Sequence, residues 1–348
     1  MRIQMKHVSV AHGNIRPEKG AGVNAAGAMS TWPGPPAELR ELTTKKSARR
    51  VVAVAVTYHP DMAVFLLALQ ASREQVDRLI VIDNGSAAAL QSELATLCAR
   101  HNCDFIPLST NVGIAGAQNQ GIARALDDNA SHVLLLDQDS IAAPDMVARL
   151  RAALDSANGT SQRVAAVGPR LVDRRSGVAT PFLRIGVFSV RRLRCTSASS
   201  AVFQTDFLVA SGSLIPAAAL RQIGLMDEGL FIDNVDLEWC FRARQQGWTL
   251  LGACDAELAH SVGDQVVHFA GRALYRHGPL RQYYIMRNRI LLYRRPYSPR
   301  GWVIQDFLRM LLKIILFGVI FPPRIKNLRM MAYGVRDGLR GRSGPFPG

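Results

Sequence analysis

The stretch HVLLLDQDS, residues 132–140, contains an apolar run that stops at two acids, Asp137 and Asp139, with one residue between them. Side chains of a strand alternate between its two faces, so both carboxylates point the same way if extended backbone continues into the next loop. Two ionised carboxylates in one small volume repel each other unless a cation or strong hydrogen-bond donors lie between them. A strand that ends in a solvated turn has the same pattern, so the neighbouring segments must decide.

Upstream of this stretch, apolar runs alternate with segments of helical spacing. The apolar runs are VVAVAV (51–56), LIVID (79–83) and FIPLS (105–109), and the helical segments are DMAVFLLALQAS (61–72), SAAALQSELATLCARH (86–101) and NVGIAGAQNQGIARALDD (111–128). This alternation across short loops is typical of an α/β fold with a doubly wound, mostly parallel sheet. Ligands of such sheets bind at the carboxyl ends of the strands, which are followed directly by Thr57, Asp83, Asn111 and Asp137.

The net charge of +15 is concentrated at one end of the 348-residue chain. Residues 271–348 contain 16 Lys and Arg but only two acids, Asp306 and Asp337, a balance of +14 that leaves +1 for the other residues. A basic protein invites a nucleic-acid hypothesis. Here the charges are interleaved with aliphatic runs such as LLKIILFGVIF (311–321), without the stacking aromatics of nucleic-acid sites. We therefore expect no nucleic-acid partner.

The sequence contains five cysteines: Cys98, Cys103, Cys195, Cys240 and Cys254. Their spacing shows neither a disulfide framework nor a metal-ligand pattern, which predicts a reducing compartment. The N-terminus has no apolar signal core, so we expect a cytoplasmic protein. Residues 1–48 are rich in Gly, Ala and Pro without a lasting period and are interpreted as a flexible tail.

Several segments together resemble one enzyme family. Four of them, in this order, resemble the nucleotide-binding half of family 2 inverting glycosyltransferases of the GT-A fold: VTYHP (56–60), VIDNGS (81–86), NVGIAGAQNQG (111–121) and LLLDQDS (134–140). GLFIDNVDLEWCFRARQQGW (229–248) is similar to the acceptor-side helix of the same family. HSVGD (260–264) and RQYYIMRNRILLYRR (281–295) look most like bacterial rhamnosyltransferases that build surface polysaccharides. The resemblance covers roughly residues 50–295.

The resemblance gives the two acids of the opening stretch a role. In this family the last acid of the D-x-D usually ligates a metal and the first helps to hold the nucleotide sugar, which here are Asp139 and Asp137. A divalent cation there neutralises the charge that develops on the departing diphosphate, and hard oxygen ligands suit Mg²⁺ or Mn²⁺. His260 is expected to complete the metal site as a neutral imidazole, with a purely structural histidine as the alternative.

The resemblance also assigns residues to the nucleotide. Asp83 is expected to accept a hydrogen bond from a pyrimidine ring, beside Thr57 at the edge of the base site. The alternative for Asp83 is a turn cap, because D-N-G-S is turn chemistry. Asn111 is expected to contact the nucleotide or to cap the glycine-rich turn, and these two roles are compatible.

An acceptor hydroxyl becomes an effective nucleophile when a positioned carboxylate takes its proton. In the family this base is an Asp six residues before an Arg, and Asp236 stands six residues before Arg242. Val235 precedes it, where many relatives have Glu. Asp233 lies one helical turn earlier and is a second candidate for the site. For both aspartates the alternative is a plain acidic helix start, and Glu238 has the spacing for an ion pair with Arg242.

The basic C-terminal part contains WVIQDFLRMLLKIILFGVIF (302–321), nearly a membrane-length apolar run. Gln305, Arg309 and Lys313 recur every four residues on one stripe of it. Charged groups in the middle of a membrane span are costly, so we expect an amphipathic helix at an anionic membrane surface. A core helix packed on the catalytic domain is the alternative.

These interpretations divide the chain into a flexible tail (1–48), a GT-A catalytic domain (49–265) and a basic C-terminal helical module (266–348). The narrower resemblance implies dTDP-L-rhamnose as the donor, with a UDP-hexose as the alternative, and a lipid-linked or polysaccharide acceptor. We expect the enzyme at the cytoplasmic face of the membrane. A non-catalytic nucleotide-sugar-binding protein is the rival class, but the presence of both the metal acids and the candidate base argues against it.

Overall fold

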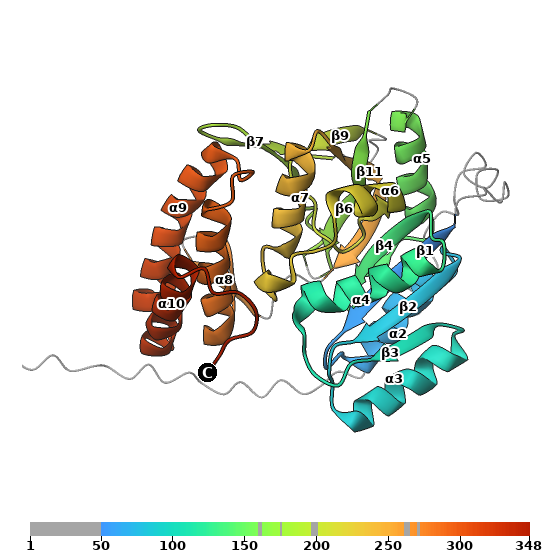
Figure 1. The fold of residues 1–348 in the computed structure, drawn as a ribbon, viewed down its shortest axis with the longest axis horizontal. Helices are drawn as coiled ribbons and strands as arrows, with labels where there is room; N and C mark the ends of the chain where they lie inside the picture. The colour runs from blue at the N-terminus through green and yellow to red at the C-terminus, as the bar shows by residue number, and fades with distance from the viewer. Residues whose placement is uncertain (1–49, 159–161, 175, 196–200, 261–264, 270–271) are drawn as a thin grey trace, which may run out of the picture. The chain divides into compact units, whose positions relative to one another are not determined.

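The computed structural model of the protein describes residues 50–348 with gaps at 159–161, 175, 196–200, 261–264 and 270–271 (Figure 1). All described residues belong to one compact unit, Pro36–Gly348. The predicted flexible tail, residues 1–48, lies outside the described residues.

A nine-stranded sheet forms the centre of this unit. Its strands are β1 (Val51–Thr57), β2 (Arg78–Asp83), β3 (Asp104–Pro107), β4 (His132–Asp137), β5 (Ile141–Ala142), β6 (Val164–Asp173), β9 (Val202–Thr205), β10 (Leu214–Pro216) and β11 (Thr249–His260). The order is β3-β2-β1-β4-β10-β6-β11-β5, and β9 also pairs with β11. β3, β2, β1 and β4 are parallel, as are β6 and β11, whereas β10 is antiparallel to both neighbours. The predicted α/β fold with a mostly parallel sheet is confirmed.

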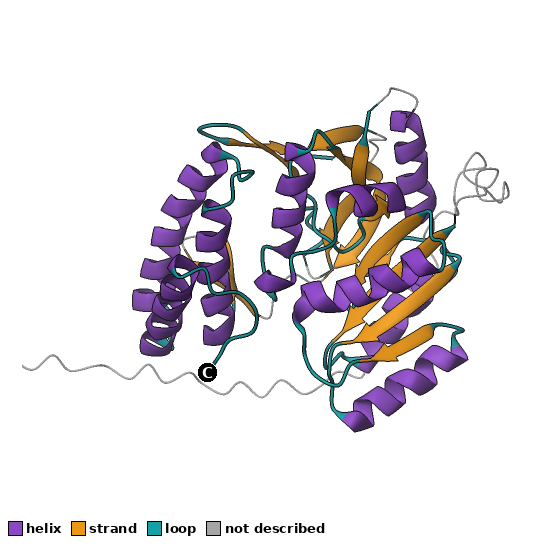
Figure 2. Ribbon diagram, in the orientation of Figure 1, coloured by secondary structure: helices purple, strands orange, loops and turns teal. Residues whose placement is uncertain are grey.

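Helices cover both faces of the sheet (Figure 2). They are α2 (Met62–Arg73), α3 (Ala88–Arg100), α4 (Gly113–Asp127), α5 (Met146–Asn158), α6 (Ala217–Ile223) and α7 (Val235–Gln245). The alternation of β1 explains the two layers: Val52 and Val54 pack with α4, whereas Val51 and Ala53 pack with α2, α3 and α5. A Cβ at Gly121 would lie 2.2 Å from Val54 Cγ1, so glycine allows α4 to approach β1 closely.

The C-terminal part consists of three helices that lie side by side in Figure 1, α8 (Pro279–Tyr293), α9 (Arg300–Ile315) and α10 (Arg324–Leu339). A short π-helical turn, η3 (Leu316–Ile320), follows α9, and the hairpin β12 (Gln265–Phe269) and β13 (Arg272–Arg276) precedes α8. The three helices share a small core of five buried side chains: Met286, Ile290, Met310, Phe317 and Met331.

The helix α9 turns its apolar side outward, which is the reverse of an ordinary surface helix. Ile304, Leu308 and Leu312 are exposed, with 61% of Leu308 accessible to solvent, while Asp306 is buried. One residue of the predicted polar stripe contacts protein: Gln305 Nε2 donates to Gly186 O (3.0 Å) and to Val187 O (3.3 Å). Among the described residues, no helix has both the length and the hydropathy required to span a bilayer.

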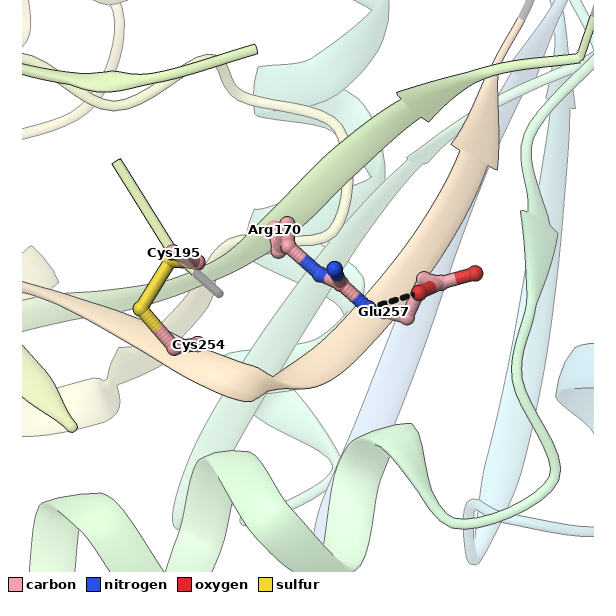
Figure 3. The surroundings of a disulfide bond; sticks show 4 residues. All are labelled: Arg170, Cys195, Cys254 and Glu257. Atoms are coloured by element: carbon pink, nitrogen blue, oxygen red, sulfur yellow. Dashed lines mark hydrogen bonds and ion pairs between the residues drawn. A yellow bond between two sulfur atoms is a disulfide. The ribbon is translucent and has the colours of Figure 1, made fainter. Parts of the chain in front are cut away.

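The cysteines contradict one expectation. Cys195 and Cys254 form a disulfide with a Cα–Cα distance of 5.4 Å, which joins the segment after β8 (Val190–Leu193) to β11 (Figure 3). The prediction of a chain without disulfides is therefore wrong, and the cysteine argument for a reducing compartment does not hold. The two residues are 59 positions apart, so only the fold brings them together. An ion pair between Arg170 and Glu257 lies nearby and links β6 to β11.

Candidate active site

Asp83, at the end of β2, is fully buried and accepts four hydrogen bonds. Its Oδ1 accepts from Thr57 Oγ1 (3.0 Å) and Ser86 Oγ (2.7 Å), and its Oδ2 accepts from the Ser86 amide (2.8 Å) and Gln91 Nε2 (2.9 Å). The two contacts with Ser86 are those of a capped turn. Thr57 and Asp83 thus lie together at the strand edge, as the sequence predicts, and the turn-cap alternative for Asp83 is confirmed.

Asn111 caps the turn into α4. Its Oδ1 accepts from the Gly113 amide (2.9 Å) and from Asn84 Nδ2 (3.2 Å). Asn84 Oδ1 in turn accepts from the Val112 amide (2.9 Å), so the two asparagines fix the loops that follow β2 and β3 against each other. Asn111 therefore has its capping role, at the edge where Thr57 and Asp83 also lie.

The two acids of the opening stretch meet His260 from the end of β11. One ligand atom from each of Asp137, Asp139 and His260 lies within 4.8 Å of the others. His260 Nδ1 lies 3.3 Å from Asp139 Oδ1 and 3.0 Å from Ser140 Oγ. Ser211 Oγ accepts from the Asp137 amide (3.0 Å), which holds the strand end in place. Two carboxylate oxygens and an imidazole nitrogen are a donor set that Mn²⁺ or Mg²⁺ accepts, so the residues fit the expected metal.

The charges of this cluster are mutually dependent. Burial raises the pKa of Asp137, and the charge of Asp139 raises it further, whereas His260 and Arg281 oppose the shift. Burial lowers the pKa of His260, but its hydrogen bond to Asp139 and the charges of Asp139 and Asp137 outweigh burial, and the net pKa is raised. Positive charge is therefore favoured between these carboxylates.

Asp236 lies in the first turn of α7 and is only partly exposed. Its Oδ1 accepts from the Leu237 amide (2.8 Å), and its side chain borders a small cavity with Leu135, Met226 and Trp239. Burial raises the pKa of Asp236 to about 7, and the charges of Asp137 and Asp233 contribute to the same shift. The candidate base is thus within range of the charge of the strand-end acid Asp137.

The segment before α7 has an unusual backbone. Phe231, Asp233 and Asn234 all have positive φ angles, of 64°, 65° and 63°, a region that side chains other than Gly, Asn and Asp rarely adopt. Asp233 forms a two-point ion pair with Arg281 of α8, with Nε–Oδ2 and Nη2–Oδ1 distances of 3.1 Å each. Gly113 permits the close approach of Phe231 to α4, because its Cβ would lie 2.5 Å from Phe231 O.

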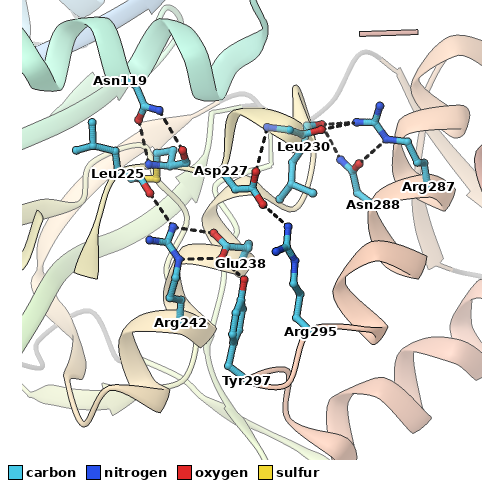
Figure 4. Close-up of polar contacts among 12 residues, drawn as sticks. Asn119, Leu225, Asp227, Leu230, Glu238, Arg242, Arg287, Asn288, Arg295 and Tyr297 are labelled. Atoms are coloured by element: carbon cyan, nitrogen blue, oxygen red, sulfur yellow. Dashed lines mark hydrogen bonds and ion pairs between the residues drawn. The ribbon is translucent and has the colours of Figure 1, made fainter. Parts of the chain in front are cut away.

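Two buried residues of α8 hold this segment, residues 229–234, which we call the acceptor loop after the role that the sequence resemblance predicts. Asn288 Nδ2 donates to the carbonyls of Leu230 (2.9 Å), Ile232 (2.7 Å) and Asp233 (2.8 Å). Arg287 Nη2 donates to Leu230 O (2.9 Å) and Gly229 O (3.2 Å), as Figure 4 shows in part. The sequence quoted for the family resemblance contains both residues, but their role was missed because nothing local in an Arg-Asn pair indicates a loop more than 50 positions away.

The helix α7 and the segment before it are tied to the rest of the fold by further polar contacts. Glu238 and Arg242 form the predicted ion pair, with two contacts of 2.9 Å, and Tyr297 Oη donates to Glu238 Oε1 (2.6 Å) (Figure 4). Asn119 of α4 donates to Met226 O (3.0 Å) and accepts from the Met226 amide (2.9 Å). Glu238 is therefore a structural residue, and Asn119 joins α4 to the segment that precedes α7.

Comparison with known proteins decides the family. The family described as "Glycosyl transferase family 2" matches residues 56–192. The dTDP-rhamnosyl transferase RfbF of Shigella flexneri is 30% identical over 294 residues, which cover 84% of this chain and 97% of RfbF. The chain belongs to glycosyltransferase family 2. It is thus a glycosyltransferase, as the sequence predicts.

Other similarities agree with this assignment. The galactofuranosyltransferase GlfT1 of Mycobacterium tuberculosis is 30% identical over 272 residues, covering 74% of this glycosyltransferase and 86% of GlfT1. Among solved structures, the mannosyltransferase PcManGT from Pyrobaculum calidifontis, in complex with GDP-Man and Mn²⁺, is similar with a TM-score of 0.50 at 13% identity. That similarity covers 87% of this chain and 92% of PcManGT and shows a shared GT-A fold.

Proposed function

We propose that this glycosyltransferase moves L-rhamnose from dTDP-L-rhamnose to a hydroxyl of a lipid-linked or polysaccharide acceptor, with inversion at the anomeric carbon. The observation that carries the proposal is the cluster of Asp137, Asp139 and His260 at the strand edge, with Asp236 within range of the charge of Asp137. A displacement with inversion requires a leaving-group site and a base on opposite sides of the reacting carbon. The choice of donor is supported by the similarity to RfbF.

On the donor side, Asp137 would hold the nucleotide sugar, and Asp139 and His260 would hold Mg²⁺ or Mn²⁺. The metal would neutralise the negative charge of the nucleoside diphosphate. Asp83 would accept the N3–H of the pyrimidine beside Thr57. Its four present donors leave no free position, but Gln91 also donates to Leu108 O (3.0 Å) and would keep that partner on releasing Asp83. Asn111 would line the nucleotide site from the adjacent loop.

On the acceptor side, Asp236 would take the proton of the attacking hydroxyl. Its raised pKa makes it an effective proton acceptor near neutral pH. Asp233 would support the same side, where its ion pair with Arg281 fixes its orientation. Thymine and uracil present the same N3–H to Asp83, so a UDP-hexose remains the alternative donor.

We further propose that residues 49–265 form the catalytic domain and that the basic module (266–348) binds an anionic membrane surface from the cytoplasmic side. Two observations support binding at the interface. The exposed apolar side of α9 is continued by Val187 and Phe188 at the tip of the hairpin of β7 (Phe182–Ile185) and β8, where Phe188 is 91% exposed and Gln305 makes its two hydrogen bonds. Arg309, an exposed basic residue of the same helix, suits anionic lipids.

The donor assignment is tested with purified full-length protein and a panel of nucleotide sugars. We expect dTDP-L-rhamnose to bind with the highest affinity in calorimetry, to be hydrolysed slowly without acceptor, and to give a product of inverted anomeric configuration by NMR. Tight binding of a UDP-hexose together with no binding of dTDP-L-rhamnose would overturn the donor. A product that retains the configuration would overturn the mechanism.

A further inference from the structure

Three cationic side chains gather where α8 meets α9. The Arg289 guanidinium contacts Asp306 (Nε–Oδ2 3.2 Å), and this contact fixes the register of the two helices. The helices α8 and α9 are joined by a short turn at residues 294–299 and therefore run in opposite directions. At a rise of about 1.5 Å per residue, Arg281 lies about 12 Å from Arg289 along α8. Lys313 lies about 10 Å from Asp306 along α9, in the same direction. Lys313 thus lies level with Arg281.

The side chains of this cluster are not fully neutralised. Arg281 pairs with Asp233 and Arg289 with Asp306, but Lys313 makes no hydrogen bond or ion pair with any described residue. Arg289 Nη1 is buried and has no hydrogen-bond partner among the described residues. Two donor groups, the Lys313 ammonium and Arg289 Nη1, therefore have no partner among the described residues.

The electrostatics of Lys313 agree with this geometry. Burial lowers the pKa of Lys313 to about 8, the charges of Arg289 and Arg281 lower it further, and Asp233 and Asp306 only partly offset them. Enclosing a cation among other cations is costly unless an anion binds there. The arrangement therefore favours the binding of an anion between these side chains.

The position of the cluster indicates which anion it receives. On one side, Arg281 contacts Asp233 of the acceptor loop, three residues from the candidate base Asp236. On the other side, Lys313 stands on α9 beside Leu312, which belongs to the exposed apolar side of the helix. A molecule with a hydroxyl at Asp236, a negative charge at the cluster and an apolar chain along α9 matches these three features together.

We propose that Arg281, Arg289 and Lys313 bind the phosphate that links the acceptor saccharide to its lipid, and that the lipid chain follows the exposed apolar side of α9. The proposal rests on the proposed function and narrows the acceptor from a saccharide in general to a lipid phosphate ester. The diphosphate of the donor is the other source of the same chemistry. The donor's charge, however, would be met by a divalent cation at Asp137, Asp139 and His260, whereas Arg289 and Lys313 belong to helices that follow the acceptor loop in the chain.

The test uses full-length protein and farnesyl diphosphate, a soluble prenyl diphosphate, with farnesol and dTDP as comparison ligands at fixed salt. Lys313→Met removes the charge at nearly constant shape, and Lys326→Met removes an exposed charge on α10 as the matched control. We expect Lys313→Met to weaken farnesyl diphosphate binding about tenfold or more, the scale of a lost charged hydrogen bond, while Lys326→Met has no effect. Farnesol should bind equally weakly to all variants, and dTDP equally to all.

Equal affinity of Lys313→Met and the unmodified protein for farnesyl diphosphate would overturn the site. A Lys313→Met variant that loses affinity for dTDP but not for farnesyl diphosphate would overturn it too. Removing an unpaired, partly buried charge should leave the melting temperature unchanged or higher, so thermal unfolding recognises a folding defect. In that case Lys313→Arg serves as the variant that should retain binding. If farnesyl diphosphate binds through Lys313 but dTDP-L-rhamnose does not bind, the donor proposal fails and this site stands. If the donor is turned over and farnesyl diphosphate does not bind, this site alone fails.

Discussion

Asp236 is held where a carboxylate ionises with difficulty, and this determines how the enzyme should respond to pH. Its pKa of about 7 has burial as the main cause, with the charges of Asp137 and Asp233 added. A general base acts in its ionised form, so protonation below this pKa removes it. We expect kcat/KM to rise about tenfold per pH unit up to roughly pH 7 and then to level off. A profile that is flat on the acid side of neutrality would contradict the role of Asp236.

The substitution Asp236→Asn keeps the shape of the side chain but cannot accept the proton. We expect donor affinity to be unchanged and kcat to fall about a hundredfold or more. The measurement is donor binding by calorimetry together with steady-state turnover. A near-normal kcat would move the base role to Asp233, because Glu238 is buried and is already paired with Arg242 and Tyr297.

Asp139 contacts His260 in the cluster that fits a divalent cation. We expect Asp139→Ala to abolish transfer, and a chelator to abolish the activity of the unmodified protein until Mn²⁺ or Mg²⁺ is restored. Glu93→Ala, which removes an exposed acid on α3, is the control and should retain activity. Full turnover in excess chelator would remove the metal from the mechanism.

At the residue scale, the sequence predicted where the site residues lie better than it predicted which residues they contact. Thr57, Asp83, Asn111 and Asp137 lie at the strand edge because each follows an apolar run whose direction and pairing are regular. The four hydrogen bonds to Asp83 were not predictable, since one of them comes from Gln91 on the following helix and depends on how that helix packs.

At the scale of elements, the acceptor loop depends on α8. Three positive φ angles cost conformational energy that the contacts from Asn288 must offset. We expect Asn288→Ala to lower kcat strongly while leaving donor affinity unchanged, because the loop that precedes Asp236 relaxes while the donor edge is untouched. Leaving buried carbonyls without a donor should also cost about 1–3 kcal/mol of stability.

A matched control for Asn288 lies on the same helix. Gln282 is fully buried, but neither of its side-chain polar atoms has a hydrogen-bond partner among the described residues. Gln282→Met should therefore leave kcat nearly unchanged. If both substitutions lower kcat and donor affinity alike, Asn288 has only a structural role.

The elements that could be predicted are those with strong local patterns. β1 to β4 and helices α2 to α4 follow from continuous apolar runs and segments of helical spacing. β10 was not predicted, because Leu214–Pro216 is too short to show a period and its pairing between β4 and β6 comes from distant chain. The Cys195–Cys254 disulfide was missed for the same reason.

At the scale of the whole molecule, membrane binding should depend on the exposed side of α9. We expect the full-length protein to bind anionic vesicles, with partial release by high salt, since charge attraction is screened and apolar insertion is not. The double substitution Leu308→Glu and Leu312→Glu should prevent binding in vesicle flotation without lowering the melting temperature, because both side chains are exposed.

The control is Val178→Glu, at an exposed apolar position between β6 and β7, which should bind vesicles normally. Substitution is a sharper test than removal of the last helices. Arg287 contacts the Gly344 carbonyl, and the Gly344 amide donates to Gly229 O (2.7 Å), so truncation would also disturb the acceptor loop. Equal binding by the double variant would place the membrane contact elsewhere.

The contacts of Gly344 with the acceptor loop also set an order of events during synthesis on the ribosome. The pairings of β1 to β4 close within residues 51–137, so the nucleotide half can form while most of the chain is still being made. The acceptor loop must wait for Arg287, Asn288 and finally Gly344 to emerge. A nascent chain can therefore form the strand edge that carries Thr57, Asp83 and Asp137 well before the loop that precedes Asp236 gains its contacts.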